Sequence, residues 1–200
     1  MPVHLTRRDP GLQRLILLFQ PSEAERRITR LVGDMLRDLD GIAAPVRTRL
    51  LHATVAVLLD IDMLSDAVIE RYKAIGDYVA KRRFEQFDLR FNRASRREAG
   101  HQPLVLTSAD GRRTFRAMQQ AIVDAMGLLR LPPLPHGLSN PHTTLLYGEG
   151  KIDRPITPVP WRLKELRLVH SHVGLSRHDV LETWTLPPAL DLFSGLDWTP

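Results

Sequence analysis

Short apolar runs and amphipathic stretches alternate along the first part of the chain. The apolar run over residues 13–20 predicts a strand. Ser22 and Glu25, three residues apart, form a capping-box pattern that predicts the start of a helix. We expect this helix to end near Gly41 and to bury its apolar stripe in the core. The stripe consists of Ile28, Leu31, Val32, Met35, Leu36 and Leu39.

The same pattern continues through the rest of the chain. The Leu- and Val-rich run over residues 49–61 predicts a buried strand, and the periodicity of residues 65–80 predicts an amphipathic helix. Further elements are expected as a strand over 84–94, a strand over 104–107, a helix over 111–129, a proline-rich loop over 131–141, an extended segment from 141, strands over 163–173 and 180–186, and an irregular tail from about 187. This order favours a layered α+β fold whose two halves each contain a histidine-bearing strand.

The composition is typical of a folded protein in water. Of the 200 residues, 43% are hydrophobic and 26% are charged. No apolar run reaches the roughly 18 to 20 residues that span a bilayer, and the N-terminus has no signal-peptide core. We therefore expect a cytoplasmic protein that does not associate with a membrane. The chain has no cysteine, which excludes disulfides, thiolate metal sites and a cysteine nucleophile. No linker interrupts the pattern, so we expect one domain over residues 1–200.

The formal net charge of +5 favours an anionic partner or substrate. Arginine supplies most of the positive charge, and its planar guanidinium suits phosphate. The stretch after Phe84 is crowded with four arginines, Arg90, Arg93, Arg96 and Arg97. They form either a basic lip for RNA phosphates or a solvated sheet edge.

Two short segments share the pattern His-x-Thr, and both lie in predicted strands. These are His52 with Thr54, and His142 with Thr144. Residues i and i+2 of a strand project from the same face, so each segment places an imidazole beside a hydroxyl. Thr143 should point to the opposite face and be structural.

Two imidazoles and two hydroxyls match the needs of phosphodiester hydrolysis. The reaction needs a base for the attacking water, an acid for the leaving oxygen, and donors for the phosphoryl oxygens. Histidine titrates near neutral pH, so one imidazole can begin neutral and the other protonated. We therefore expect His52 and His142 to be catalytic, and Thr54 and Thr144 to bind phosphate, with no metal and no cofactor.

Several histidines admit other interpretations. Any one histidine alone is more often structural than catalytic. His170 and His172 form an i, i+2 pair that could bind a metal, but the nearby sequence offers no carboxylate or third histidine as a further ligand. His101 and His178 lie near predicted turns or strand ends, where solvated histidine is expected. His136 lies on the loop that leads to His142 and is a candidate substrate-binding residue.

The paired motifs resemble the signature of the 2H phosphoesterase superfamily, which includes the bacterial 2′-5′ RNA ligase-like RNA 2′,3′-cyclic phosphodiesterases. The segments 141–146 (PHTTLL), 166–171 (LRLVHS) and 179–186 are similar to family patterns. The resemblance implies a bilobal fold of two pseudo-symmetric lobes of antiparallel sheet with flanking helices around a central cleft. His52 and His142 would face each other across it, with Thr54 and Thr144 holding the phosphate.

Two departures from the family pattern affect the expected substrate. Residues 57–59 replace a usual aromatic residue and Leu-Gly pair, so the turn there should differ. Tyr147 stands where the RNA-directed bacterial members often carry an arginine, and it could stack on a base or donate to a phosphate.

The resemblance and the motifs together lead to a functional hypothesis. We expect a metal-independent phosphodiesterase that converts 2′,3′-cyclic phosphate ends of RNA to 2′-phosphates, with reversible 2′-5′ RNA ligation by the same residues. The alternatives are a small cyclic-nucleotide phosphodiesterase, or a non-catalytic RNA-binding module that retains the fold. The expected partner is RNA or a nucleotide with a cyclic phosphate. No protein partner is inferred, and a monomer is expected.

Overall fold

A computed structural model describes residues 11–96, 102–108, 110–149 and 151–189. Its elements, in chain order, are β1 (Gln13–Phe19), α1 (Glu23–Leu39), η1 (Thr48–Leu50), β2 (Ala53–Ile61), α2 (Asp66–Lys81), β3 (Phe87–Arg96), β4 (Gln102–Ser108), α3 (Arg112–Leu128), β5 (His142–Gly148), β6 (Ile152–Leu163), β7 (Glu165–His172) and β8 (Arg177–Thr185). No helix in the described ranges is long and apolar enough to cross a membrane.

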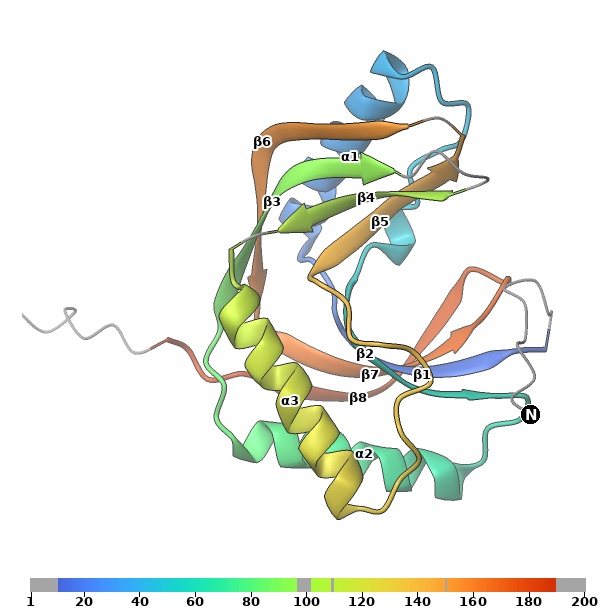
Figure 1. The fold of residues 1–200 in the computed structure, drawn as a ribbon, viewed down its shortest axis with the longest axis vertical. Coiled ribbons are helices and arrows are strands. Elements are labelled where there is room, and N and C mark those ends of the chain that lie inside the picture. The colour runs from blue at the N-terminus through green and yellow to red at the C-terminus, as the bar shows by residue number, and fades with distance from the viewer. Residues whose placement is uncertain (1–10, 97–101, 109, 150, 190–200) are drawn as a thin grey trace, which may run out of the picture.

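The strands form two four-stranded antiparallel sheets, one in each lobe (Figure 1). Sheet A has the order β2-β1-β7-β8, and sheet B has the order β5-β4-β3-β6. Sheet A therefore takes its strands from both ends of the chain, whereas sheet B takes its strands from the middle. The two motif-bearing strands, β2 and β5, are edge strands of different sheets. This arrangement confirms the expected bilobal α+β fold.

The helices cover the outer sides of the sheets and tie the lobes together. Helix α2 packs against β7, β8 and α3, while α1 packs against β5 and β6 of sheet B (Figure 1). One cluster of buried side chains joins residues of both sheets, and Trp161, Phe19, Phe91 and Phe115 are its largest fully buried members. The indole Nε1 of Trp161 donates a 2.8 Å hydrogen bond to the Thr29 hydroxyl, which links α1 to sheet B.

Helix α1 begins as the sequence predicts but buries a different face. Ser22 caps the helix, and its capping box with Glu25 is complete. The predicted core stripe is wrong at four positions, because Ile28, Leu31, Met35 and Leu39 are 44%, 64%, 50% and 66% exposed. The buried face of the helix instead consists of Thr29, Gly33 and Leu36, so Leu36 is the one member of the predicted stripe that is fully buried. A Cβ at Gly33 would lie 2.8 Å from Val46, so this face allows a close approach that a larger side chain would prevent.

Strand β6 has no counterpart in the prediction. Its prolines, Pro155, Pro158 and Pro160, lack an N–H and argue against a strand interior. They are tolerated because β6 is the edge of sheet B and pairs only with β3. The pairing also places β3 inside the sheet, so its arginines do not form a solvated sheet edge.

The predicted basic lip also differs from the structure. Arg93 forms an ion pair with Asp153, and Arg96 is buried. Neither these residues nor Arg90 line the cleft described below. Arg97 and His101 lie outside the described residues.

Candidate active site between two edge strands

A cleft of about 910 Å³ lies between the two motif-bearing strands. His52 directly precedes β2, and His142 is the first residue of β5. Both histidines line the cleft, together with the other four residues singled out in the sequence: Thr54, Thr144, Tyr147 and His136. The structure therefore gathers all six candidate residues in one place.

The two histidines are held in matching ways. Nδ1 of His52 lies 2.6 Å from the backbone oxygen of Leu50, and Nδ1 of His142 lies 2.9 Å from that of Asn140. In each case the partner is the carbonyl two residues earlier in the chain. A carbonyl oxygen only accepts, so each Nδ1 carries its proton and donates it. Each Nε2 is then left to accept or donate a proton.

The surroundings of His52 keep its imidazole neutral at neutral pH. Burial, together with nearby His178, His142 and Arg47, lowers the pKa of His52 to about 4, against the opposing effect of the bond to Leu50. Nε2 of His52 therefore begins as a proton acceptor in the free protein. A phosphate anion in the cleft would act in the opposite direction and raise this pKa.

The threonines follow the alternation of the strands. Thr54 and Thr144 line the cleft, two residues after their respective histidines. Thr143, between His142 and Thr144, is fully buried on the other face of β5, as expected. The two cleft hydroxyls can donate to oxygens of a bound anion.

Two further cleft residues were missed by the sequence analysis. His178 of β8 was expected to be solvated, but its ring centroid lies 5.1 Å from that of His52. Burial lowers the pKa of His178, and the nearby Arg47 lowers it further. Arg47 itself lies just before η1, with its guanidinium carbon 5.2 Å from the centroid of the Tyr147 ring. Neither residue belongs to a motif, and only the tertiary structure brings them to the cleft.

His136 belongs to a charged network at one side of the cleft. Arg14 binds Asp60 through two hydrogen bonds of 2.5 and 2.9 Å, and Nε2 of His136 lies 2.8 Å from the same carboxylate. Burial by itself would raise the pKa of Asp60, but the hydrogen bonds from Arg14 and His136 outweigh it and lower the pKa. The network fastens the proline-rich loop to β1 and β2.

A group of metal-ligand type lies on β7 and β8, in sheet A. His170 and His172 approach Asp179, and one potential ligand atom from each lies within 4.8 Å of the others. The carboxylate that the local sequence did not provide therefore comes from the neighbouring strand.

Comparison with known proteins places the fold in a defined group. The profile of the 2′-5′ RNA ligase superfamily matches residues 19–179. Among solved structures, Escherichia coli LigT complexed with 3′-AMP has a TM-score of 0.67 at 20% identity, with 88% of this chain and 98% of that chain covered. The protein TT0787 of Thermus thermophilus has a TM-score of 0.63 at 22% identity, with the same coverage. Kluyveromyces marxianus Usb1 with uridine monophosphate has a TM-score of 0.51 at 12% identity, covering 88% of this chain and 99% of that chain. No curated protein sequence matches the chain significantly.

Proposed function

Because the chain belongs to the 2′-5′ RNA ligase superfamily, a group of 2H phosphoesterases and ligases, we propose that it hydrolyses 2′,3′-cyclic phosphate ends of RNA to 2′-phosphates. His52 and His142 are the proposed acid–base pair. Thr54 and Thr144 are the proposed phosphate donors, and Tyr147 and His136 are proposed to contact the substrate.

The observation that carries this proposal is the matched orientation of the two imidazoles. Both bind a backbone carbonyl through Nδ1 and line the same cleft. A structural histidine needs no such counterpart on the other sheet. Two preoriented Nε2 atoms in one cleft are what acid–base catalysis of phosphodiester hydrolysis requires.

The proposed reaction transfers two protons and exchanges one P–O bond for another. The water oxygen attacks phosphorus while one Nε2 accepts the water proton. The bond from phosphorus to the 3′ oxygen breaks, and the other Nε2 donates its proton to that oxygen. The product has a 2′-phosphate and a 3′-hydroxyl, and the two imidazoles end with exchanged protonation states. With the 5′-hydroxyl of another RNA end in place of water, the same steps form a 2′-5′ linkage, and their reversal breaks that linkage.

Cationic and hydroxyl groups in the cleft suit a phosphodiester anion. Thr54 and Thr144 offer one hydroxyl each from the two lobes. Arg47 adds a guanidinium beside Tyr147, the position at which RNA-directed relatives often carry an arginine. We propose that Arg47 supplies the positive charge that Tyr147 lacks, which keeps an RNA end as the leading substrate.

A nucleotide-sized ligand is consistent with the cleft and with the relatives. The volume of about 910 Å³ is within the range of small-molecule sites. E. coli LigT has been crystallised with 3′-AMP, and K. marxianus Usb1 with uridine monophosphate. Tyr147 also offers an aromatic face for a base, so a small cyclic-nucleotide phosphodiesterase is the second candidate.

The test is turnover of a short RNA that ends in a 2′,3′-cyclic phosphate, measured in excess chelator beside 2′,3′-cyclic AMP. We expect chelator-resistant conversion to the 2′-phosphate. His52→Ala and His142→Ala should each lower kcat by about 10²–10⁴-fold, the usual contribution of one acid–base group. Thr54→Val and Thr144→Val should weaken turnover while leaving both imidazoles in place.

Thr157→Ala is the control, because Thr157 is exposed on β6 and does not line the cleft. It should retain wild-type turnover. Hydrolysis of the cyclic mononucleotide without hydrolysis of the RNA would favour the second candidate. Binding of the RNA with no turnover of either substrate would overturn the enzymatic proposal in favour of an RNA-binding module.

A further inference from the structure

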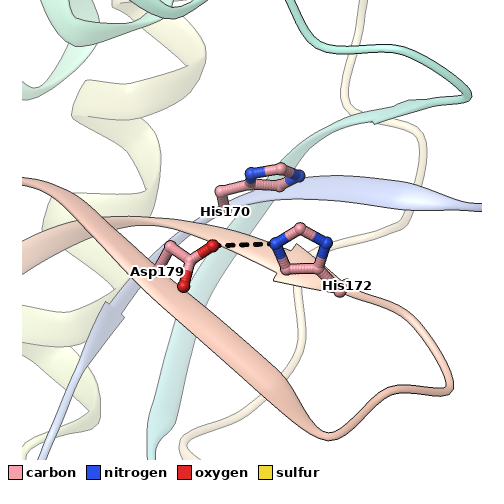
Figure 2. A group of neighbouring side chains, drawn as sticks. All are labelled: His170, His172 and Asp179. Atoms are coloured by element: carbon pink, nitrogen blue, oxygen red, sulfur yellow. Dashed lines mark hydrogen bonds and ion pairs between the residues drawn. The ribbon is translucent and has the colours of Figure 1, made fainter.

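A metal-ligand geometry is built into the hairpin of β7 and β8, apart from the two motif histidines. His170 and His172 are separated by one residue on β7, so both imidazoles lie on the same face of the strand. The antiparallel register pairs His170 directly with Asp179 of β8. Directly opposed residues of paired strands share a face, so the carboxylate joins the two imidazoles (Figure 2).

The three side chains converge. Nε2 of His172 lies 2.8 Å from Oδ2 of Asp179, as the dashed line in Figure 2 marks. The ring centroids of His170 and His172 are 4.1 Å apart. One ligand atom from each of the three residues lies within 4.8 Å of the other two. A first-row metal ion with ligands at about 2.0–2.2 Å can be reached from these positions by small side-chain rotations.

His170 supplies a second, independent observation. Its Nε2 atom is buried and has no hydrogen-bond partner among the described residues. A buried polar atom without a partner is unfavourable and normally has a ligand or a water. The neighbouring His172 and Asp179 satisfy each other and leave this nitrogen unsatisfied.

We propose that His170, His172 and Asp179 form a binding site for a divalent first-row transition metal ion, with Zn²⁺ as the probe of choice. Two imidazoles and one carboxylate are a ligand set that suits Zn²⁺ and its neighbours, whereas Ca²⁺ and Mg²⁺ prefer oxygen ligands alone. The site is independent of the proposed phosphodiesterase activity.

The metal site lies beside the proposed active site but uses none of the proposed catalytic or phosphate-binding residues. Ser171 and His178 are paired across the same hairpin, and His178 contacts His52. Strand alternation therefore places His170 and Asp179 on the other face of the hairpin, the face that α2 covers farther along β8, whereas His172 also lines the cleft. A metal there links β7 to β8 beside His178 and stabilises this wall of the cleft.

Arg177 sets the affinity of the site. Its guanidinium binds both oxygens of Asp179, at 2.9 Å from Oδ1 and 2.8 Å from Oδ2. Its positive charge opposes a cation on the same carboxylate, while its bond to Oδ1 can persist and orient the ligand. Removing the positive charge of Arg177 should therefore tighten metal binding. If the group served only as a set of ion pairs, the same change would destabilise the hairpin and would not increase affinity for a metal.

The experiment is titration of the chelator-treated full chain with Zn²⁺, followed by calorimetry and by the shift in thermal unfolding temperature. We expect each chain to bind one Zn²⁺ ion tightly and to have a higher unfolding temperature with the metal bound. Asp179→Asn and His172→Gln should each weaken binding by at least about tenfold, because each removes one of three ligands. Arg177→Gln should bind Zn²⁺ several-fold more tightly than wild type.

His142→Ala is the matched control, because the cleft histidines could also attract Zn²⁺. This variant should bind one Zn²⁺ ion as tightly as wild type does. The proposal would be overturned if His142→Ala lost tight Zn²⁺ binding, or if both Asp179→Asn and His172→Gln retained it. Because these outcomes are read from metal binding alone, they are distinct from any failure of the phosphodiesterase assay.

Discussion

Removing the His52 imidazole should make the protein less sensitive to acid. Burial and neighbouring cations lower the pKa of His52 from 6.5 to about 4 in the folded chain. Between these two values the unfolded chain binds the proton more readily than the folded chain. The stability contributed by a neutral His52 is thus fully present above the unfolded pKa and is lost as the pH falls toward the folded pKa.

The size of this effect follows from the two pKa values. Each unit of difference corresponds to about 1.4 kcal/mol at 25 °C. For pKa values of 6.5 and about 4, linkage gives a loss of about 2.5 kcal/mol in the free energy of unfolding between about pH 7.5 and about pH 4.5. His52→Gln has no titrating group here, so it should lose that much less stability than wild type over the same interval.

Urea unfolding at the two pH values measures the difference directly. Other acid-sensitive groups contribute to both proteins and largely cancel when the two losses are subtracted. Thr157→Ala, an exposed substitution that removes no titrating group, should retain the full wild-type acid sensitivity. Equal losses in wild type and His52→Gln would refute the conclusion that burial keeps this imidazole neutral.

Three further substitutions test the packing and the cleft network. Gly76→Ala should lower the free energy of unfolding by about 1–3 kcal/mol in urea, because the new Cβ would lie 2.2 Å from the Trp184 ring. Thr29→Val should be destabilising by about 1–3 kcal/mol, because it leaves the buried Trp161 N–H without its acceptor, and Thr29→Ser should restore most of that loss. Asp60→Asn weakens the contacts that hold the proline-rich loop, so it should raise KM for the cyclic-phosphate RNA several-fold; a lower kcat with unchanged KM would contradict this role.

Local signals in the sequence predicted most elements, and the errors have identifiable causes. The capping box located the start of α1, because it depends only on residues within one turn. Periodicity identified an apolar face on α1, but the helix buries the face of Thr29, Gly33 and Leu36, where Gly33 allows a close approach to Val46. Strand β6 was missed because its prolines are tolerated only at an edge, and edge position is a property of the whole sheet.

The metal-ligand group illustrates a different limit. The pairing of Asp179 with His170 depends on the register between β7 and β8, which shifts at an irregularity between Leu168 and Val169. A register shift of one residue would move the carboxylate to the other face of the sheet. The sequence contains both histidines, but it does not specify the register, so it could not supply the third ligand.

The candidate site likewise has residues that local sequence specifies and residues that only the fold brings to it. Each motif histidine is oriented by a carbonyl only two residues away, and its threonine follows by strand alternation, so both motifs carry their own local geometry. Arg47 joins the site only because β5 places Tyr147 beside it, and His178 joins only because β8 places it beside His52. The groups proposed for proton transfer can therefore be found from sequence patterns, whereas the groups that surround the substrate require the assembled sheets. Because Arg47 and His178 also lower the pKa of His52, changes at either residue should alter the protonation of His52 as well as contacts to the substrate.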